Sequence, residues 1–351
     1  AVVSGTQDRA GIVRAVIGLT EREGAPAVLV SDIGECRSYE ELPSEGTAER
    51  ARAYVKIEDG CENFCSYCRV PYVRGPVRSR DFERIREEVL RLADRGFREI
   101  VLTGIDLGAY GRDFGGSPSL AEVLEMAARV RGIARVRLSS VDPTDVTDRL
   151  LDIMGSEPAV CPHLHVPLQS GDDDVLRRMN RRYTGGEFEA VVARARARVS
   201  DLAVTSDVIV GFPGEDEQAF ESTMALCRRV GFSRLHVFQY SRRRGTVAAG
   251  LAGQVVREEK QRRSERLIAL GRELALKFHR GLLGQVVHVL VEQSHDVACE
   301  GLTGNYVRVV ASRRAGDEGL SASPGAIVAV RVTEAQEGFV RGVVEGSAEG
   351  V

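Results

Sequence analysis

Three cysteines lie close together in the segment Cys61-Glu62-Asn63-Phe64-Cys65-Ser66-Tyr67-Cys68. Cysteine thiolates are the usual ligands of iron–sulfur clusters, and a four-iron cluster is normally held by four of them. A loop that offers three thiolates leaves one iron for a small molecule. S-adenosylmethionine is the obvious candidate, because its amino and carboxylate groups can chelate that iron. The spacing therefore predicts a [4Fe-4S] cluster held by Cys61, Cys65 and Cys68.

A structural zinc ion is the alternative for this loop. Zinc needs four protein ligands, usually drawn from Cys-x2-Cys pairs with a second pair nearby. No second pair follows in range, and His163 and His165 lie far along the chain in an apolar run, as core or pocket histidines do. Three further cysteines are isolated and are predicted to be buried apolar thiols: Cys161, Cys227 and Cys299.

Length and composition limit the class of protein. A chain of 351 residues predicts two or three domains. Seven cysteines, an odd number, do not suggest a disulfide framework, so we expect a reducing, cytoplasmic compartment. No apolar run approaches the ~20 residues that span a bilayer. The net charge of −3 does not by itself indicate a nucleic-acid partner. The first residues, Ala1-Val2-Val3, already resemble a strand, and we expect a fragment of a longer protein.

The cysteine loop must be positioned by the elements around it. Six short β-rich runs alternate with amphipathic helical patterns, at residues 54–57, 100–103, 136–139, 164–166, 204–210 and 235–238. Such alternation predicts an α/β fold with a parallel sheet, and six units suit a partial (β/α)6 barrel. Because the loop directly follows the first strand, it should lie at the carboxyl ends of the strands, where parallel α/β folds place their sites.

The rest of the chain predicts a second β structure. Residues 256–281 have the pattern of one long helix. Four β-rich runs follow, at residues 286–291, 306–310, 327–332 and 339–344, separated by Gly- and Ser-rich turns. This pattern predicts a small β-barrel. The region from residue 283 onward has more acidic than basic residues, so its charge alone does not predict RNA binding.

Three motifs together resemble one family. They are the cysteine loop, the segment Asp-Val-Ile-Val-Gly-Phe-Pro-Gly-Glu at 207–215 and the segment Val-Pro-Leu-Gln-Ser-Gly at 166–171. With them the chain resembles the radical S-adenosylmethionine (radical SAM) methylthiotransferases. The resemblance implies the end of an N-terminal α/β domain at 1–50, a radical SAM core with its following helix at 51–281, and a TRAM-like β-barrel at 282–351.

Within the family, residues 102–111, 179–184 and 236–243 are most similar to the branch that modifies N6-threonylcarbamoyladenosine next to the tRNA anticodon. This implies transfer of a methylthio group, with one S-adenosylmethionine as radical source and another as methyl donor. The implied partners are tRNA, a flavodoxin- or ferredoxin-like electron donor and a sulfur source. The isopentenyladenosine branch is an alternative. Family members commonly carry histidine where Asp106 stands and glutamate where Asp142 stands.

The resemblance also implies site residues, with none catalytic beyond the cluster ligands. The cofactor contacts would be Tyr67, Thr103, Gly104, Ser139, Gln169, Val210 and Gly211. RNA contacts would come from Arg74, Arg78, Arg80, Arg181, Arg182, Arg242, Arg243, Tyr306 and Arg308. Alternatives remain for each group: Ser139 can simply end a strand, Tyr306 can be a core residue, and the arginines can form ordinary surface ion pairs.

The front of the chain departs from the family. The N-terminal domain of family members supplies three more cysteines for a second [4Fe-4S] cluster. Here Thr6 stands where one is expected, and Cys36 is the single cysteine before Cys61, so the ligands of that cluster are not in this chain. Two rivals follow: a radical SAM tRNA-modifying enzyme that does not insert sulfur, and a non-catalytic RNA-binding protein with a structural cluster.

Overall fold

Six parallel strands form an open, curved sheet in the computed structural model, which describes residues 1–19, 27–41, 51–295, 297–312 and 323–347. They pair in the orders β3-β6-β7 and β10-β9-β8, and isolated bridges join β7 to β8. The strands are β3 (Ala53–Lys56), β6 (Glu99–Thr103), β7 (Arg135–Leu138), β8 (His163–His165), β9 (Ala203–Val210) and β10 (Arg234–Gln239). The predicted partial barrel is confirmed, with each strand within one residue of its predicted bounds.

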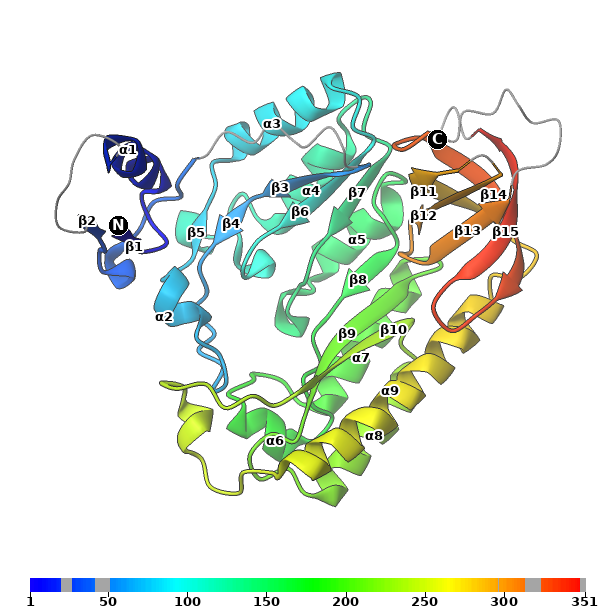
Figure 1. The fold of residues 1–351 in the computed structure, drawn as a ribbon. Helices are drawn as coiled ribbons and strands as arrows, with labels where there is room; N and C mark the ends of the chain where they lie inside the picture. Colours follow the sequence, from blue (N-terminus) through cyan, green and yellow to red (C-terminus); the bar gives the residue numbers. More distant parts are fainter. Residues whose placement is uncertain (20–26, 42–50, 296, 313–322, 348–351) are drawn as a thin grey trace.

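Helices cover the outer face of this sheet (Figure 1). On α3, the residues Ile85, Val89 and Leu92 recur at helical spacing and are buried in the core that the strands and helices share. Asp81 caps this helix by accepting a hydrogen bond from the N–H of Arg84. The helices between the strands are α3 (Phe82–Asp94), α4 (Leu120–Ala128), α5 (Asp148–Ser156), α6 (Asp173–Arg178), α7 (Gly185–Arg198) and α8 (Glu217–Val230).

A small α/β unit precedes the barrel. Strands β1 (Val2–Ser4) and β2 (Ala27–Leu29) pair in parallel around α1 (Arg9–Leu19). The single-turn segment η1 (Ile33–Glu35) then contacts α2 (Val70–Arg74), the short helix that follows the cysteine loop. The remaining short elements are β4 (Glu58–Asp59), β5 (Arg78–Ser79), η2 (Leu107–Ala109), η3 (Arg112–Phe114), η4 (Pro143–Asp145) and η5 (Val247–Gly250).

A closed five-stranded barrel forms the C-terminal part, at the end of the long helix α9 (Arg257–Arg280) (Figure 1). Four of its strands were predicted, and the fifth, β12, was not. A glycine within β12 weakened its strand pattern, yet the barrel requires it: a Cβ on Gly301 would lie 2.0 Å from the carbonyl oxygen of Leu290. The strands are β11 (Val286–Ser294), β12 (Ala298–Thr303), β13 (Arg308–Ser312), β14 (Ile327–Ala335) and β15 (Val340–Ser347). None of the described helices combines the length and apolar character of a membrane-spanning segment.

A buried cluster of charges joins the two barrels. Glu99 is fully buried and lies 3.1 Å from Arg137 Nε, 3.7 Å from Arg135 Nη1 and 3.7 Å from Arg52 Nε. Arg135 and Arg137 also donate hydrogen bonds into the C-terminal barrel, to the carbonyl oxygens of His288, Leu302, Thr303 and Gly304. One carboxylate thus orients the arginines that fasten the sheet to the second barrel.

His279 at the end of α9 makes a second contact between the two parts and leads to a pH prediction. Burial lowers the pKa of His279, although its Nδ1–H donates to the carbonyl oxygen of Gln336 at 2.6 Å. Below about pH 6.5 the unfolded chain binds a proton there that the folded chain resists, so stability should fall as the pH drops from that value. We expect the loss of urea-unfolding stability between pH 7.5 and pH 5.5 to be smaller in His279→Gln than in the wild type. The exposed His295 supplies a matched control, and equal pH dependence in His279→Gln and His295→Gln would contradict this role.

Candidate functional site

The cysteine loop is a defined turn after the first barrel strand. It begins at Gly60, whose φ is 102°; a Cβ there would lie 1.9 Å from the carbonyl oxygen of Pro76. Within the loop, the N–H of Cys68 donates to the carbonyl oxygen of Cys65 at 2.9 Å. The loop therefore presents three half-buried thiols that form no disulfide: Cys61, Cys65 and Cys68.

The segment Met179-Asn180 holds this loop from the other side. Asn180 adopts a φ of 59°, and its side-chain amide donates to the carbonyl oxygens of Asn63 and Phe64 at 3.2 and 3.0 Å. The N–H of Ser66 donates to the carbonyl oxygen of Met179 at 2.9 Å. Two segments that the sequence singled out separately therefore fix each other's conformation.

The spacing of the thiols discriminates between a single ion and a cluster. Thiolates around one tetrahedral zinc ion lie about 3.8 Å apart, because Zn–S bonds are about 2.3 Å long. Among the described residues, one group of three potential ligands has all its atoms within 4.8 Å of one another, and it is His165, Asp207 and His236. The cysteine sulfurs are spread more widely than one zinc ion allows. Three thiols in one loop are the ligand set that leaves one iron of a [4Fe-4S] cluster for a small molecule.

Polar groups next to the thiols control their charge. Arg181 Nη1 lies 3.3 Å from Cys65 Sγ and is ion-paired with Asp142, while Asp106 Oδ2 lies 3.6 Å from Cys61 Sγ. Burial and the Asp106 carboxylate raise the pKa of Cys61 to about 12. This thiol would therefore ionise only with a bound metal, which deprotonates its cysteine ligands. Both positions at which the chain departs from common family residues, Asp106 and Asp142, lie beside the loop.

A cavity of about 250 Å³ opens beside Cys68 and brings together two of the predicted cofactor contacts, Tyr67 and Gln169. Gln169 has a φ of 62°, and its backbone N–H donates to the carbonyl oxygen of Asp207 at 2.9 Å. The cavity is lined by Tyr67, Cys68, Gln169, Asp207, Ile209, Phe238, Gln239, Tyr240, Ser241 and Arg243. Because Cys68 lies in its wall, this cavity is the candidate site for S-adenosylmethionine.

Other predicted contacts lie nearby but outside this cavity. Gly104 follows β6 and packs on Glu58: a Cβ would lie 2.7 Å from Glu58 Oε2. Burial raises the pKa of Glu58 to about 8, and its Oε1 has no hydrogen-bond partner in the described part of the chain. An unsatisfied buried carboxyl group beside Thr103 and Gly104 fits the expected position of the cofactor's amino group.

Val210 and Gly211 are less open to a ligand. The side chain of Val210 is buried in the barrel core. Gly211 has a φ of 70°, and a Cβ there would lie 2.4 Å from Cγ of Lys260. Neither lines the cavity beside Cys68, so any contact with a cofactor would have to come from their backbone.

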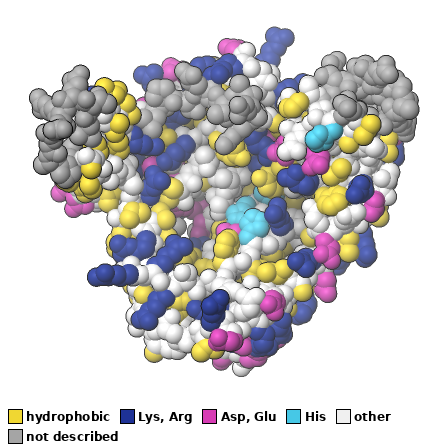
Figure 2. Space-filling model, viewed as in Figure 1, with side chains coloured by type: hydrophobic (Ala, Val, Ile, Leu, Met, Phe, Trp, Pro, Cys, Tyr) yellow, Lys and Arg dark blue, Asp and Glu magenta, His cyan; other side chains and the backbone are white. Residues whose placement is uncertain are grey.

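A second cavity of about 350 Å³ lies between the concave face of the sheet and the C-terminal barrel. Ser139 lines it, and the Ser139 hydroxyl is buried without a hydrogen-bond partner among the described residues. Histidine side chains are visible in this hollow in Figure 2. We call it the histidine chamber; its lining is Tyr54, Val101, Arg137, Leu138, Ser139, Ser140, His163, His165, Thr205, Asp207, Arg234, His236, Phe238 and Tyr306. Asp207 and Phe238 line both cavities.

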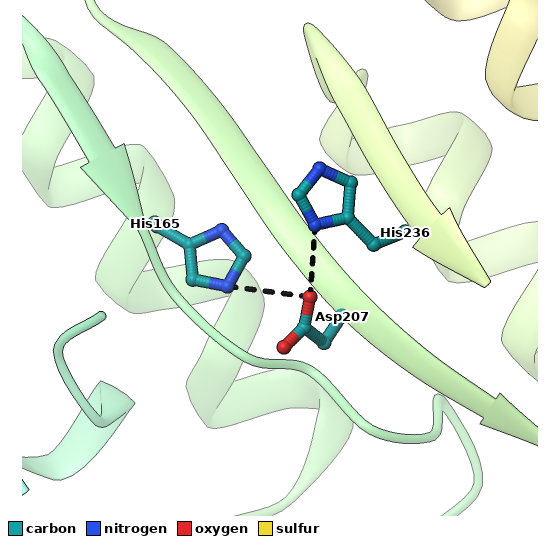
Figure 3. A group of neighbouring side chains, drawn as sticks. All are labelled: His165, Asp207 and His236. Carbon is teal, nitrogen blue, oxygen red and sulfur yellow. Dashed lines mark hydrogen bonds and ion pairs between the residues drawn. The ribbon is translucent and has the colours of Figure 1, made fainter. Parts of the chain in front are cut away.

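Three polar side chains in the chamber were not predicted as a group. His165, Asp207 and His236 come from the neighbouring strands β8, β9 and β10, and both imidazoles point at one oxygen of Asp207 (Figure 3). Burial raises the pKa of Asp207, but hydrogen bonds from the two histidines outweigh it and hold that pKa well below the usual range. Sequence reasoning treated His165 as a core or pocket histidine. The available signal was its place at the end of a strand, where α/β sites collect.

The prediction that Arg78 and Arg80 contact RNA is corrected by the structure. The Arg78 side chain is 1% exposed and donates to the carbonyl oxygens of Arg74 and Pro76. The Arg80 side chain is 8% exposed and ion-paired with Glu41 and Glu88. Buried and paired guanidinium groups stabilise the surroundings of the loop and cannot reach a phosphate. The side chain of Arg181 is 7% exposed and faces the cysteines.

The other predicted RNA contacts are more accessible. Arg182, Arg242 and Arg243 are exposed, and Arg243 lines the cavity beside Cys68. Arg74 is partly exposed, 3.5 Å from Asp59, and Arg308 is exposed near Glu292 and Glu300. Tyr306 is half-buried instead of fully exposed. Its ring lies 4.8 Å from that of His163, and the Arg137 guanidinium lies 4.5 Å from its centroid.

The N-terminal unit places Thr6 against α2, the helix that follows the cysteine loop, and Cys36 against Gln7. Thr6 Oγ1 donates to the carbonyl oxygen of Val73 in α2 at 2.7 Å, and Cys36 Sγ lies 3.0 Å from Gln7 Oε1. The position at which family members carry a cysteine therefore adjoins the helix that follows Cys68. Cys36 alone cannot hold a cluster there.

Comparison with known proteins gives these features a context. Residues 55–227 match the family model of the radical SAM superfamily. The chain is 40% identical over 314 residues to the threonylcarbamoyladenosine tRNA methylthiotransferase MtaB of Bacillus subtilis (strain 168), covering 88% of this chain and 69% of that protein. It is 40% identical to MtaB of Thermotoga maritima, covering 77% of this chain and 61% of that protein.

A relative with another name is similar to nearly the same degree. The tRNA-2-methylthio-N(6)-dimethylallyladenosine synthase of Carboxydothermus hydrogenoformans is 38% identical over 84% of this chain, which spans 66% of that protein. All three relatives are thus longer than the present chain. The radical SAM match and 40% identity over 88% of this chain show that it belongs to the radical SAM tRNA methylthiotransferase family.

Proposed function

We propose that this protein transfers a methylthio group to N6-threonylcarbamoyladenosine next to the anticodon of tRNA, giving the 2-methylthio product. The observation that carries the proposal is the position of the cysteine loop: three thiols at the carboxyl end of the first barrel strand adjoin a cavity of about 250 Å³. The MtaB relatives support the choice of nucleoside. A tRNA substrate implies a cytoplasmic reaction.

The chain's own residues would position the reactants. Cys61, Cys65 and Cys68 would hold a [4Fe-4S] cluster that, with S-adenosylmethionine, supplies one-electron chemistry. Arg181 donates to Cys65 Sγ at 3.3 Å and can hold that ligand in place. Tyr67, packed against apolar residues at the cavity wall, would exclude water from the cofactor. An electron donor of the flavodoxin or ferredoxin type and a sulfur source complete the proposal.

RNA would approach over the exposed arginines at the mouth of the barrel. Arg182, Arg242 and Arg243 are exposed, and basic side chains gather on this face of the molecule in Figure 2. Arginine binds phosphate with charge-assisted, often bidentate hydrogen bonds. These three residues, with the partly exposed Arg74, form the proposed phosphate-binding rim.

The substrate can be tested directly. We expect tRNA nucleosides from cells that lack the gene to lose 2-methylthio-N6-threonylcarbamoyladenosine in mass spectra and to accumulate the form without sulfur. Plasmid-borne wild-type protein should restore the product. Retention of that product, with loss of the 2-methylthio isopentenyl derivative instead, would assign the chain to the second branch, which the dimethylallyladenosine synthase relative favours.

The first alternative is a radical SAM tRNA-modifying enzyme that does not insert sulfur. It is suggested by Thr6, at a position where a cysteine is expected, and by Cys36 as the single cysteine before Cys61. Iron and sulfide counts on the anaerobically reconstituted full-length protein separate the two: about eight irons per chain favour methylthio transfer, and about four favour the rival. A structural cluster in an RNA-binding protein is the remaining alternative. It predicts that the reduced protein forms no 5′-deoxyadenosine from S-adenosylmethionine.

A further inference from the structure

The trio in the histidine chamber, His165, Asp207 and His236, has the composition of a metal site. Two imidazoles and one carboxylate are the ligand set of many catalytic zinc and non-haem iron centres. The three residues lie on adjacent strands whose pairing fixes them: His236 is the register partner of Asp207, and His165 is the partner of Thr205. The hydrogen-bonded sheet therefore preorganises the group without help from a loop.

The distances within the trio are compatible with a bound ion. Asp207 Oδ1 lies 3.4 Å from His165 Nε2 and 3.2 Å from His236 Nδ1. Charge-assisted N–H···O contacts are usually about 2.7–2.9 Å long. Ligand atoms around a tetrahedral ion with bonds of about 2.0–2.1 Å are separated by about 3.3 Å. The observed separations are within about 0.1 Å of this tetrahedral edge, so an ion could replace the two present contacts with little movement of the ligands. Figure 3 shows both ring nitrogens directed at the same oxygen.

The surroundings also suit an ion. Histidines that bind metals usually donate their other N–H to a fixed partner. Here His165 Nδ1 lies 2.9 Å from Thr205 Oγ1, which in turn contacts His163 Nε2 at 3.0 Å. The imidazole rings of His165 and His236 stack 5.5 Å apart at 29°, which leaves one side of the carboxylate open to the chamber.

Two arginine side chains in the histidine chamber disfavour the binding of a metal cation. Arg137 and Arg234 line the same chamber, although Arg137 is ion-paired with Glu99 at 3.1 Å. Their positive charge should lower the affinity of the trio for a cation, but it leaves the three ligand atoms in place.

We propose that His165, Asp207 and His236 form a binding site for one first-row divalent cation of the zinc class, with an open coordination position that faces the histidine chamber. None of the three ligands belongs to the cysteine loop, although Asp207 also lines the cavity beside Cys68, and the site does not depend on the proposed tRNA substrate. The open position would take water or an oxygen or nitrogen atom of a molecule bound in the chamber.

The test uses the full-length protein with its iron–sulfur cluster loaded anaerobically. After dialysis against Zn²⁺, elemental analysis should find one zinc per chain at an unchanged iron count. Asp207→Asn and His236→Gln should each weaken binding by about 100-fold or more, and Thr205→Val by about 10–100-fold, the usual effect of losing an outer partner. His288→Gln removes an exposed histidine from the C-terminal barrel and should bind zinc as the wild type does.

A second measurement locates the ion and guards against misfolded variants. Co²⁺ bound in place of Zn²⁺ should show d–d absorption without thiolate-to-cobalt charge transfer, and each variant should keep the wild-type iron count. Zinc binding that survives both Asp207→Asn and His236→Gln, or a thiolate charge-transfer band, would overturn the proposal. So would the absence of zinc from wild-type protein that retains its cluster.

Discussion

Replacement of Cys65 by serine should reduce the iron content from about four per chain to a background level and abolish cleavage of S-adenosylmethionine. Serine preserves the size of the side chain, but its hydroxyl is not the soft thiolate that iron–sulfur clusters require. Two thiols cannot replace three in a loop whose backbone is fixed by Gly60 and by the Met179-Asn180 segment. Anaerobic reconstitution followed by iron analysis and measurement of 5′-deoxyadenosine tests the expectation.

A cysteine outside the loop provides the matched control. Cys227 is buried in α8, and Cys227→Ala should keep both the iron and the cleavage activity. A Cys65→Ser protein that still holds four irons and still cleaves S-adenosylmethionine would show that Cys65 is not a ligand.

Glu99→Ala should lower the free energy of unfolding by about 3–5 kcal/mol, the usual cost of leaving buried charge without its partner. The substitution removes the carboxylate shared by Arg52, Arg135 and Arg137, and within the described part of the chain Arg52 alone of the three retains an ion pair, with Glu292. Because the chain has no tryptophan, circular dichroism during urea unfolding is the suitable measurement.

A partly exposed carboxylate with exposed partners serves for comparison. Glu125 forms ion pairs with Arg129 and Arg149, whose side chains are 62% and 58% exposed, so Glu125→Ala should cost less than about 1 kcal/mol. If Glu99→Ala cost no more than Glu125→Ala, the three arginines would have found other partners and the proposed junction would be incorrect.

The partial (β/α)6 barrel could be predicted from the sequence, because each of its strands is a short apolar run next to a helical pattern. Strand β12 of the C-terminal barrel was not predicted, because Glu300 and Gly301 interrupt its β pattern. That glycine is needed for the close approach of Leu290, a contact between strands that no local pattern reveals. The pairing of β11 with β12 therefore requires a glycine at position 301, although the propensity of glycine alone predicts a turn there.

Burial explains the errors among the arginines. Arg78 and Arg80 follow the cysteine loop and carry the charge that RNA requires, so the sequence grouped them with exposed basic residues. The sequence does not show that Arg80 is ion-paired with Glu41 and Glu88, nor that Arg78 donates to the carbonyl oxygens of Arg74 and Pro76. The grouping of His165, Asp207 and His236 could not be predicted for a similar reason. These residues are far apart in the sequence and come together because β8, β9 and β10 are neighbours in the sheet.

Tyr306 belongs to the C-terminal barrel, yet its ring closes the histidine chamber from a turn with a φ of 66°. The two barrels are consequently not interchangeable modules. A recombinant chain that received the C-terminal barrel of an unrelated protein would keep the cysteine loop and still lose one wall of the chamber.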